Sequence, residues 1–151
     1  MFLKPYQTLK KALGPSHWWP GENSFEIMVG AILTQNTSWK NVEKAIHRLK
    51  KEKALSPKKM HRTPVGQLAE WIRSSGYFNQ KALTLHRFLD WYAEYNYRPA
   101  QILKKHNSDS HPVRRELLSV KGIGPETADS ILCYGLELPV FVVDAYTHRW
   151  L

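Results

Sequence analysis

The chain has 151 residues, 42% of them hydrophobic and 23% charged, and its 22 Lys and Arg against 13 Asp and Glu give a net charge of +9. This length predicts one domain, 1–151, with a single hydrophobic core. One cysteine, Cys133, excludes an intramolecular disulfide and a four-cysteine metal cluster built from this chain alone. The basic balance favours a polyanionic partner, and because no apolar run reaches membrane-spanning length, we expect a soluble protein without a membrane partner.

Apolar residues at helical spacing predict that most of the chain is helical. The i, i+3, i+4, i+7 pattern occurs in Phe25–Ile32, Val42–Leu49, Val65–Ile72 and Ala128–Gly135. A further helix is predicted from about Asn79 to Tyr95, and a short one from Pro112 to Leu118. Only Val140–Val143 is expected to be extended, and without a second β-rich run it is interpreted as a buried connector. The sequence therefore predicts an all-α, compact bundle of about six helices.

A turn with two glycines, Gly122-Ile123-Gly124, separates the last two of these helices. Glycine allows a tight turn whose backbone N–H groups face outward, because no side chain prevents a phosphate from approaching the main chain. Pro125 suits the first position of a helix, so the turn presents a helix N-terminus to an anion. Together with the basic balance, this turn favours nucleic acid as the polyanion.

Asp144 follows the connector and precedes Ala145-Tyr146-Thr147, where a new helix is expected to begin. An aspartate in this position is typical of a helix N-cap. The positive end of the helix dipole also keeps such a carboxylate ionised, so Asp144 is a candidate catalytic group as well as a cap.

The hairpin, the second helix, the extended run and Asp144 resemble the helix-hairpin-helix DNA glycosylases of the endonuclease III-like superfamily. The resemblance spans residues 18–149, and the family continues with further helices, so the chain is expected to be incomplete at its C-terminus. Asp144 is then implied to stabilise the oxocarbenium-like sugar and to orient a water. The resemblance assigns DNA-backbone contacts to the hairpin, with a monovalent cation bound there. These hairpin residues are Lys121, Gly122, Ile123, Gly124 and Thr127.

Glu126 stands where the bifunctional members of this family carry a lysine that attacks the sugar and forms a Schiff base. A glutamate cannot form an imine. The resemblance therefore implies a monofunctional enzyme that uses water and has no lyase activity.

Aromatic residues for an extruded base are available in Trp18-Trp19-Pro20 and at Trp39. The alternative for these tryptophans is burial in the core. Together with the segments 33–37, 75–82 and 131–134, they resemble the branch that excises 3-methyladenine. In that branch Trp18, Trp19 and Trp39 line the base pocket, and a cationic alkylated purine stacks on indoles with added cation–π attraction.

Three further residues are candidates for DNA contacts, and two of them, Gln35 and Lys81, have a second interpretation. Gln35 stands where the family inserts a side chain into the gap left by the flipped base, or it bonds the backbone of Asn36-Thr37. Asn79 and Lys81 open a helix and are candidates for a second DNA-backbone contact, although Lys81 is equally well interpreted as solvated.

The hypothesis is a monofunctional DNA glycosylase for alkylated purines, acting as a monomer on double-stranded DNA that contains a damaged base. A cytoplasmic protein is expected, associated with the nucleoid if the source is bacterial. The alternatives are a mismatch or oxidised-base glycosylase, and a non-catalytic DNA-binding module. No cofactor is expected in this chain, and one cysteine cannot hold an iron–sulfur cluster. The seven histidines have no metal-ligand spacing; they are His17, His47, His61, His86, His106, His111 and His148.

Overall fold

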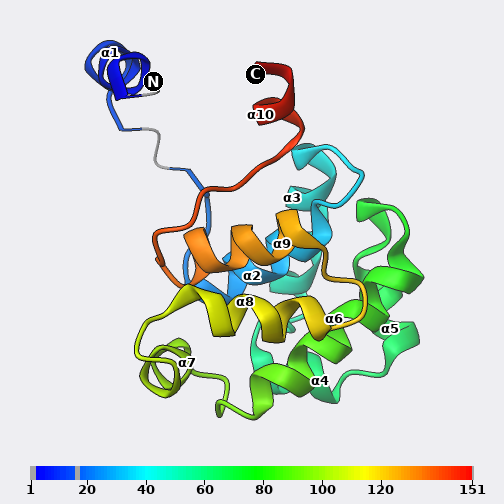
Figure 1. Cartoon of the computed structure of the whole chain (residues 1–151). Helices are drawn as coiled ribbons and strands as arrows, with labels where there is room; N and C mark the ends of the chain where they lie inside the picture. The colour runs from blue at the N-terminus through cyan, green and yellow to red at the C-terminus, as the bar shows by residue number, and fades with distance from the viewer. Residues whose placement is uncertain (1–2, 16–17, 151) are drawn as a thin grey trace.

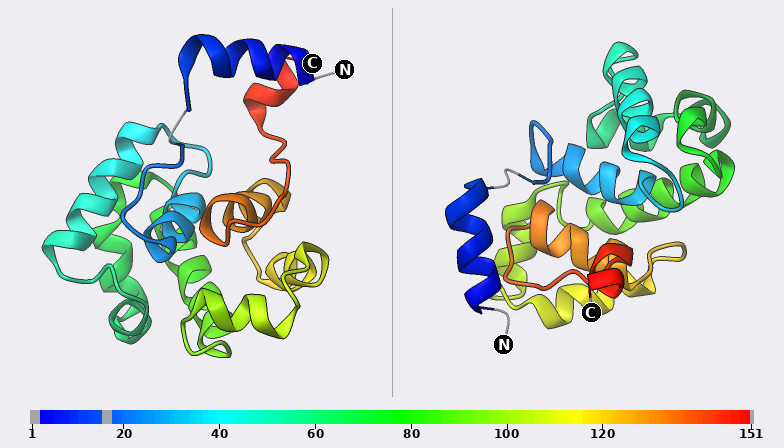
Figure 2. Two further views of the ribbon diagram at one scale, coloured as in Figure 1. Left: turned by 90° about the vertical axis from the view of Figure 1, so that its left-hand side faces the viewer. Right: turned by 90° about the horizontal axis from the view of Figure 1, so that it is seen from above.

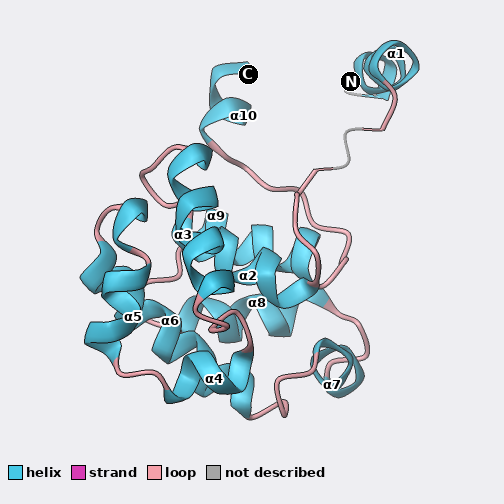
Figure 3. Ribbon diagram, turned by 180° about the vertical axis from the view of Figure 1, so that it is seen from behind, coloured by secondary structure: helices cyan, strands magenta, loops and turns pink. Residues whose placement is uncertain are grey.

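The structure is a computed structural model that describes residues 3–15 and 18–150, so His17 lies outside the described residues. Within these ranges every regular element is helical and no strand is present, which confirms the all-α prediction (Figures 1 and 3). The α-helices are α1 (Leu3–Leu13), α2 (Ser24–Leu33), α3 (Trp39–Lys51), α4 (Pro57–Arg62), α5 (Val65–Trp71), α6 (Phe78–Ala93), α7 (Pro99–Lys105), α8 (Ser110–Ser119), α9 (Pro125–Ser130) and α10 (Ala145–Trp150). A 3-10 turn, η1 (Arg73–Ser75), precedes α6, and a π-helical segment, η2 (Ile131–Gly135), continues α9.

The predicted helices correspond to α2, α3, α5, α6, α8 and the continuous α9–η2, and the expected helix after Asp144 is α10. Sequence periodicity missed α4 and α7, which are short and bury one side chain each, Met60 and Ile102. It also missed α1, which has no buried residue. The helices α4 and α7 are too short to show a full apolar stripe, whereas the apolar residues of α1, Leu3, Tyr6, Leu9 and Leu13, are exposed.

The core is built around α2, which contacts α3, α6, α9 and η2. This helix is apolar around most of its circumference, as expected for a helix that neighbours enclose on several sides. Its N-cap is Asn23, whose Oδ1 accepts a hydrogen bond from Glu26 N at 3.0 Å. The C-terminal end of α2 meets the hairpin between α8 and α9, where Gln35 bonds Gly122 and Thr127.

An ion pair fixes the two helices of the hairpin to each other. Arg114 of α8 donates from Nε to Asp129 Oδ1 at 2.6 Å and from Nη2 to Asp129 Oδ2 at 3.1 Å. Asp129 is buried on α9, and Ile123 in the turn buries its side chain in the core. The bidentate Arg114–Asp129 pair and the buried Ile123 side chain together fix the orientation of the turn relative to the core.

Both ends of the described chain stand on the same side of the bundle, where α1 and α10 lie outside the core (Figures 1 and 2). The connector before α10 is extended, but the prediction that it is buried is wrong. Val140 packs on the core, whereas Phe141 is 76% and Val143 45% exposed. In an extended segment alternate side chains point to opposite sides, and no described element covers the outer side. No helix among the described residues is long and apolar enough to span a membrane.

Candidate functional site

Three tryptophans from two segments of the chain meet at the start of α3. Trp18 lies 5.5 Å from Trp19 and 5.5 Å from Trp39 between ring centroids, and Trp19 lies 5.4 Å from Trp39 with the rings nearly perpendicular. Such centroid distances are typical of favourable aromatic pairs. The structure therefore brings together the three residues that the sequence analysis grouped as a base pocket.

Burial differs between the three indoles. Trp18 is 50% exposed, whereas Trp19 and Trp39 are half-buried against the core. Trp19 also contacts Tyr134 of η2, at 5.5 Å between ring centroids. Gly30 of α2 makes room for this packing, because a Cβ there would lie 3.2 Å from Trp19 Nε1. The cluster thus has both a core side and an open side.

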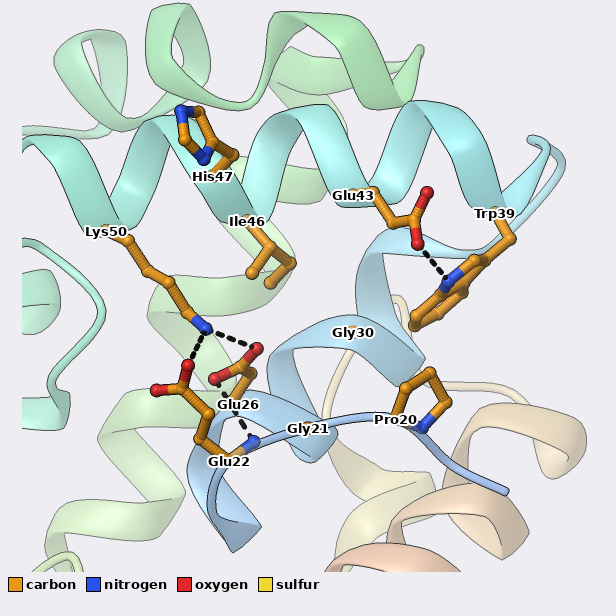
Figure 4. A pocket seen from close by; sticks show the side chains of 10 residues that line it. All are labelled: Pro20, Gly21, Glu22, Glu26, Gly30, Trp39, Glu43, Ile46, His47 and Lys50. Atoms are coloured by element: carbon orange, nitrogen blue, oxygen red, sulfur yellow. Dashed lines mark hydrogen bonds and ion pairs between the residues drawn. The ribbon is translucent and has the colours of Figure 1, made fainter. Parts of the chain in front are cut away.

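A pocket of about 430 Å³ opens beside the tryptophans, between α3 and the segment before α2 (Figure 4). At one end Trp39 Nε1 donates a hydrogen bond to Glu43 Oε1 at 3.1 Å. At the other end Lys50 pairs with Glu22 at 2.8 Å and with Glu26 at 3.0 Å. The volume of the pocket is within the range of small-molecule binding pockets. Glu43 was not among the predicted site residues, although it is the one acidic residue of a basic helix.

Asp144 is the N-cap residue of α10. Its Oδ1 accepts hydrogen bonds from Thr147 N at 2.7 Å and from Thr147 Oγ1 at 2.9 Å. Burial acts to raise the pKa of the Asp144 carboxyl, but the hydrogen bonds from Thr147 and the Tyr146 backbone outweigh it, and the pKa lies below its ordinary value. Asp144 is therefore a carboxylate at neutral pH.

The negative charge of Asp144 raises the pKa of two residues on the α9–η2 helix. Partial desolvation and, after it, the Asp144 charge raise the pKa of the Glu126 carboxyl, while His148 acts to lower it. Burial, Cys133 and the Asp144 charge raise the pKa of the Tyr134 hydroxyl. Since Tyr134 also contacts Trp19, the carboxylate lies on the side of the bundle where the tryptophans gather.

The hairpin turn presents less free backbone than the sequence suggested. Gly122 has a φ of 103°, which strongly favours glycine, and its carbonyl accepts a hydrogen bond from Gln35. Ile123 N donates to Val120 O at 3.0 Å and its side chain is buried, so neither of these groups is free to contact DNA, and the predicted contact is limited to its carbonyl. No described atom comes near the Cβ position of Gly124, the N-cap residue of α9. The open part of the turn is therefore at Gly124.

Gln35 bonds neither Asn36 nor Thr37, so that interpretation is wrong. Its Nε2 donates to Gly122 O at 3.1 Å and to Thr127 Oγ1 at 2.9 Å. Thr127 is buried and its hydroxyl accepts this bond, so the side chain of Thr127 is not free for the predicted contact with DNA. The amide of Gln35 thereby joins the end of α2 to the hairpin, a long-range contact that local sequence cannot indicate.

Both interpretations of Lys81 are wrong. The residue is 3% exposed, and its Nζ donates to Leu33 O at 2.8 Å and to Ser75 O at 2.6 Å. Desolvation by burial lowers the pKa of Lys81 to about 8. Its ammonium group closes the C-terminal end of α2 rather than contacting DNA. Asn79, by contrast, is exposed at the start of α6.

A groove of about 360 Å³ runs beside the hairpin between α6 and the end of α2, and Lys121 lines it as the hairpin's basic residue. Two further residues of this groove were missed by the sequence analysis. Tyr77 is 71% exposed with a φ of 45°, and Arg87 Nη1 donates to Lys121 O at 3.5 Å. The positive φ of a bulky residue has no sequence signal, and Arg87 comes from the middle of α6. Among the described residues no group of His, Cys, Asp and Glu side chains is arranged to hold a metal ion.

Residues 29–151 match the HhH-GPD superfamily of base excision DNA repair proteins, and the chain belongs to this superfamily. It is 47% identical over 149 residues to a Methanocaldococcus jannaschii protein that is provisionally named a DNA repair glycosylase, covering 99% of this chain and 67% of the relative. It is 27% identical over 128 residues to Thermotoga maritima endonuclease III, covering 83% of this chain and 54% of that enzyme. The chain thus spans between about half and two thirds of the length of these relatives.

Solved structures agree with the family. The Helicobacter pylori 3-methyladenine DNA glycosylase MagIII, solved with 1,N6-ethenoadenine, matches with a TM-score of 0.79 and 35% identity over 97% of this chain and 67% of MagIII. An endonuclease III–DNA complex matches with a TM-score of 0.72 at 24% identity, over 97% of this chain and 64% of that chain, which shows the shared fold. The predicted resemblance to the endonuclease III-like glycosylases is thereby confirmed.

Proposed function

We propose that the chain carries the base pocket and the catalytic carboxylate of a monofunctional DNA glycosylase that removes alkylated purines. The observation that carries this proposal is the three-tryptophan cluster on the same side of the bundle as the capped, ionised Asp144. The likeness to MagIII, a 3-methyladenine DNA glycosylase, supports the choice of substrate class.

The reaction breaks the N-glycosidic bond of a flipped nucleotide. As the base leaves, positive charge develops on the sugar, and the Asp144 carboxylate lowers the energy of that state. Its bonds to Thr147 keep the charge fixed in position before the reaction begins. A water attacks the sugar carbon, and its proton passes to solvent or to the departing base.

Glu126 supports the monofunctional assignment. It lies within electrostatic reach of Asp144, on the helix that follows the hairpin. A carboxyl group cannot form the imine that strand cleavage by a lyase requires, so water is the nucleophile. The buried Lys81, with Nζ bonded to two backbone carbonyls, is also not available as a substitute amine.

DNA binding is assigned to the hairpin and its groove. The open backbone at Gly124 and the side chains of Lys121 and Arg87 contact phosphates, and a monovalent cation at the turn is held by backbone carbonyls. The exposed Tyr77 enters the base stack, and Gln35 exchanges its bonds to the hairpin for the gap left by the flipped base. The protein acts in the cytoplasm, as a monomer, on double-stranded DNA.

Release of labelled bases from alkylated duplex DNA tests this function. We expect release of 3-methyladenine and no covalent adduct after borohydride reduction with abasic DNA. Release of only oxidised or mismatched bases would show that the substrates are not alkylated purines. A borohydride-trapped adduct would overturn the monofunctional assignment. DNA binding without release of any base would reduce the chain to a binding module.

A further inference from the structure

The strongest charge pattern outside the hairpin is on α3. Six of its thirteen residues are basic or histidine, and Glu43 is the one acidic residue among them. It lies four positions after Trp39, so the two side chains share a face of the helix. That face lines the pocket, and Trp39 Nε1 donates to Glu43 Oε1 at 3.1 Å (Figure 4). An isolated acid in a basic helix is therefore placed directly against an indole.

The three carboxylates of this pocket differ in how their charges are balanced. Glu22 and Glu26 share the ammonium group of Lys50, at 2.8 and 3.0 Å. No ion pair joins Glu43 to a cation in the described part of the chain; its partner is the neutral indole N–H of Trp39. Glu43 is thus the one carboxylate of the pocket without an ammonium partner among the described residues, and it lies at the tryptophan end.

We propose that Glu43 determines specificity in this pocket: its carboxylate orients the Trp39 indole and supplies the negative charge that selects a cationic purine over a neutral one. The inference rests on the proposed function and specifies how its substrate class is recognised. A cationic base that stacks on Trp39 gains attraction both from the indole face and from the carboxylate. A DNA phosphate is repelled by the same charge, so the pocket admits a base and excludes the backbone.

The test uses two small ligands that differ in charge, with tryptophan fluorescence as the readout. The fixed cation 3,9-dimethyladeninium represents the charged lesion, and 9-methyladenine is the neutral reference. We expect the wild-type chain to bind the cation more tightly than the neutral ligand, with about five- to tenfold of this preference supplied by the Glu43 charge, the size expected for one charge at a partly solvated site. Glu43→Gln should lower the preference by that factor, down to what the Trp39 face provides, while leaving the affinity for 9-methyladenine unchanged, because the glutamine oxygen still accepts the Trp39 bond.

Two other variants separate charge from position. Glu22→Gln is the matched control, since it removes one negative charge at the Lys50 end of the pocket, away from Trp39, and it should keep the preference for the cation. Glu43→Ala removes the hydrogen-bond acceptor as well as the charge, so it should also weaken binding of 9-methyladenine by loosening Trp39. Equal preference in the wild type and Glu43→Gln would overturn the inference.

Base release from DNA distinguishes this inference from the proposed function. If the wild type releases 3-methyladenine and Glu43→Gln leaves the ratio of 3-methyladenine to 1,N6-ethenoadenine release unchanged, the inference is wrong and the function stands. If no base is released but the small cation is still preferred in a Glu43-dependent way, the function is wrong and the charge selection stands.

Discussion

Replacing Gly122 with alanine should destabilise the fold, while the same change at Gly124 should cost much less, about the few tenths to 1 kcal/mol expected for alanine at an N-cap. The two glycines frame one turn but differ in conformation. Gly122 has a φ of 103°, and a Cβ there would overlap the hydroxyl of Thr84 and lie 3.0 Å from its Cγ2. Gly124 has a φ of −94°, and its Cβ would meet no atom within 4 Å.

The cost at Gly122 has two parts. A non-glycine residue in left-handed backbone loses about 1–2 kcal/mol. Overpacking against Thr84 adds about 1–3 kcal/mol, because the clash is with a β-branched side chain whose hydroxyl is bonded to Gln80 O at 3.0 Å. The sum, about 2–5 kcal/mol, corresponds to a fall in Tm of roughly 4–20 °C for a chain of this size.

Thermal unfolding followed by circular dichroism measures this difference. Thr84→Ala in the Gly122→Ala background should recover the steric part and leave the backbone part, which a double-mutant cycle separates. Gly124→Asp, in contrast, should fold normally and weaken binding to every DNA sequence, because its charge repels phosphate. Equal Tm values for Gly122→Ala and Gly124→Ala would refute this account of the turn.

Asp144→Asn should lower the rate of base release at least tenfold, about 1.4 kcal/mol of barrier, while DNA affinity stays the same; a smaller loss would remove Asp144 from the catalytic role. Trp39→Ala should reduce the ratio of rates on cationic and neutral lesions by about two- to thirtyfold, from roughly 0.5–2 kcal/mol of cation–π attraction, and an unchanged ratio with lowered Tm would make Trp39 a core residue only. The pKa of Lys81 is lowered to about 8, so the folded state loses this proton at lower pH than the unfolded state, whose pKa is near 10.5. The free energy of unfolding should therefore rise from pH 8 to about 9.5 in the wild type and not in Lys81→Met, as measured by urea unfolding. A flat profile in both proteins would contradict the buried-ammonium assignment.

The long helices and the hairpin could be predicted because their signals are local. The periodicity of α2 and α3 and the two glycines before Pro125 reflect constraints within a few residues. The grouping of Trp18, Trp19 and Trp39 came from resemblance to a family, since nothing in their spacing places them together. The short helices α4 and α7 bury too little to leave a pattern.

Two of the errors at the site concern side chains with partners that are distant in the sequence. Lys81 looks solvated in sequence, and only the fold places Leu33 O and Ser75 O around its ammonium. Gln35 meets Thr127 across 92 positions of the chain, so its bond could not be inferred from Asn36 or other neighbours. The last backbone carbonyls of a helix have no partner within the helix, and they accept hydrogen bonds from polar side chains that tertiary packing places nearby.

The contact between the three tryptophans has a consequence for how the protein searches DNA. A base that stacks between two of these rings needs their planes about 7 Å apart, twice an aromatic contact distance, whereas the centroids lie 5.4–5.5 Å apart. A base therefore cannot enter between these rings as they stand, and it stacks on an outer face, as the proposed contact with Trp39 requires. Stacking on an outer face needs no separation of the rings, so an extruded base can be sampled without rearranging the cluster.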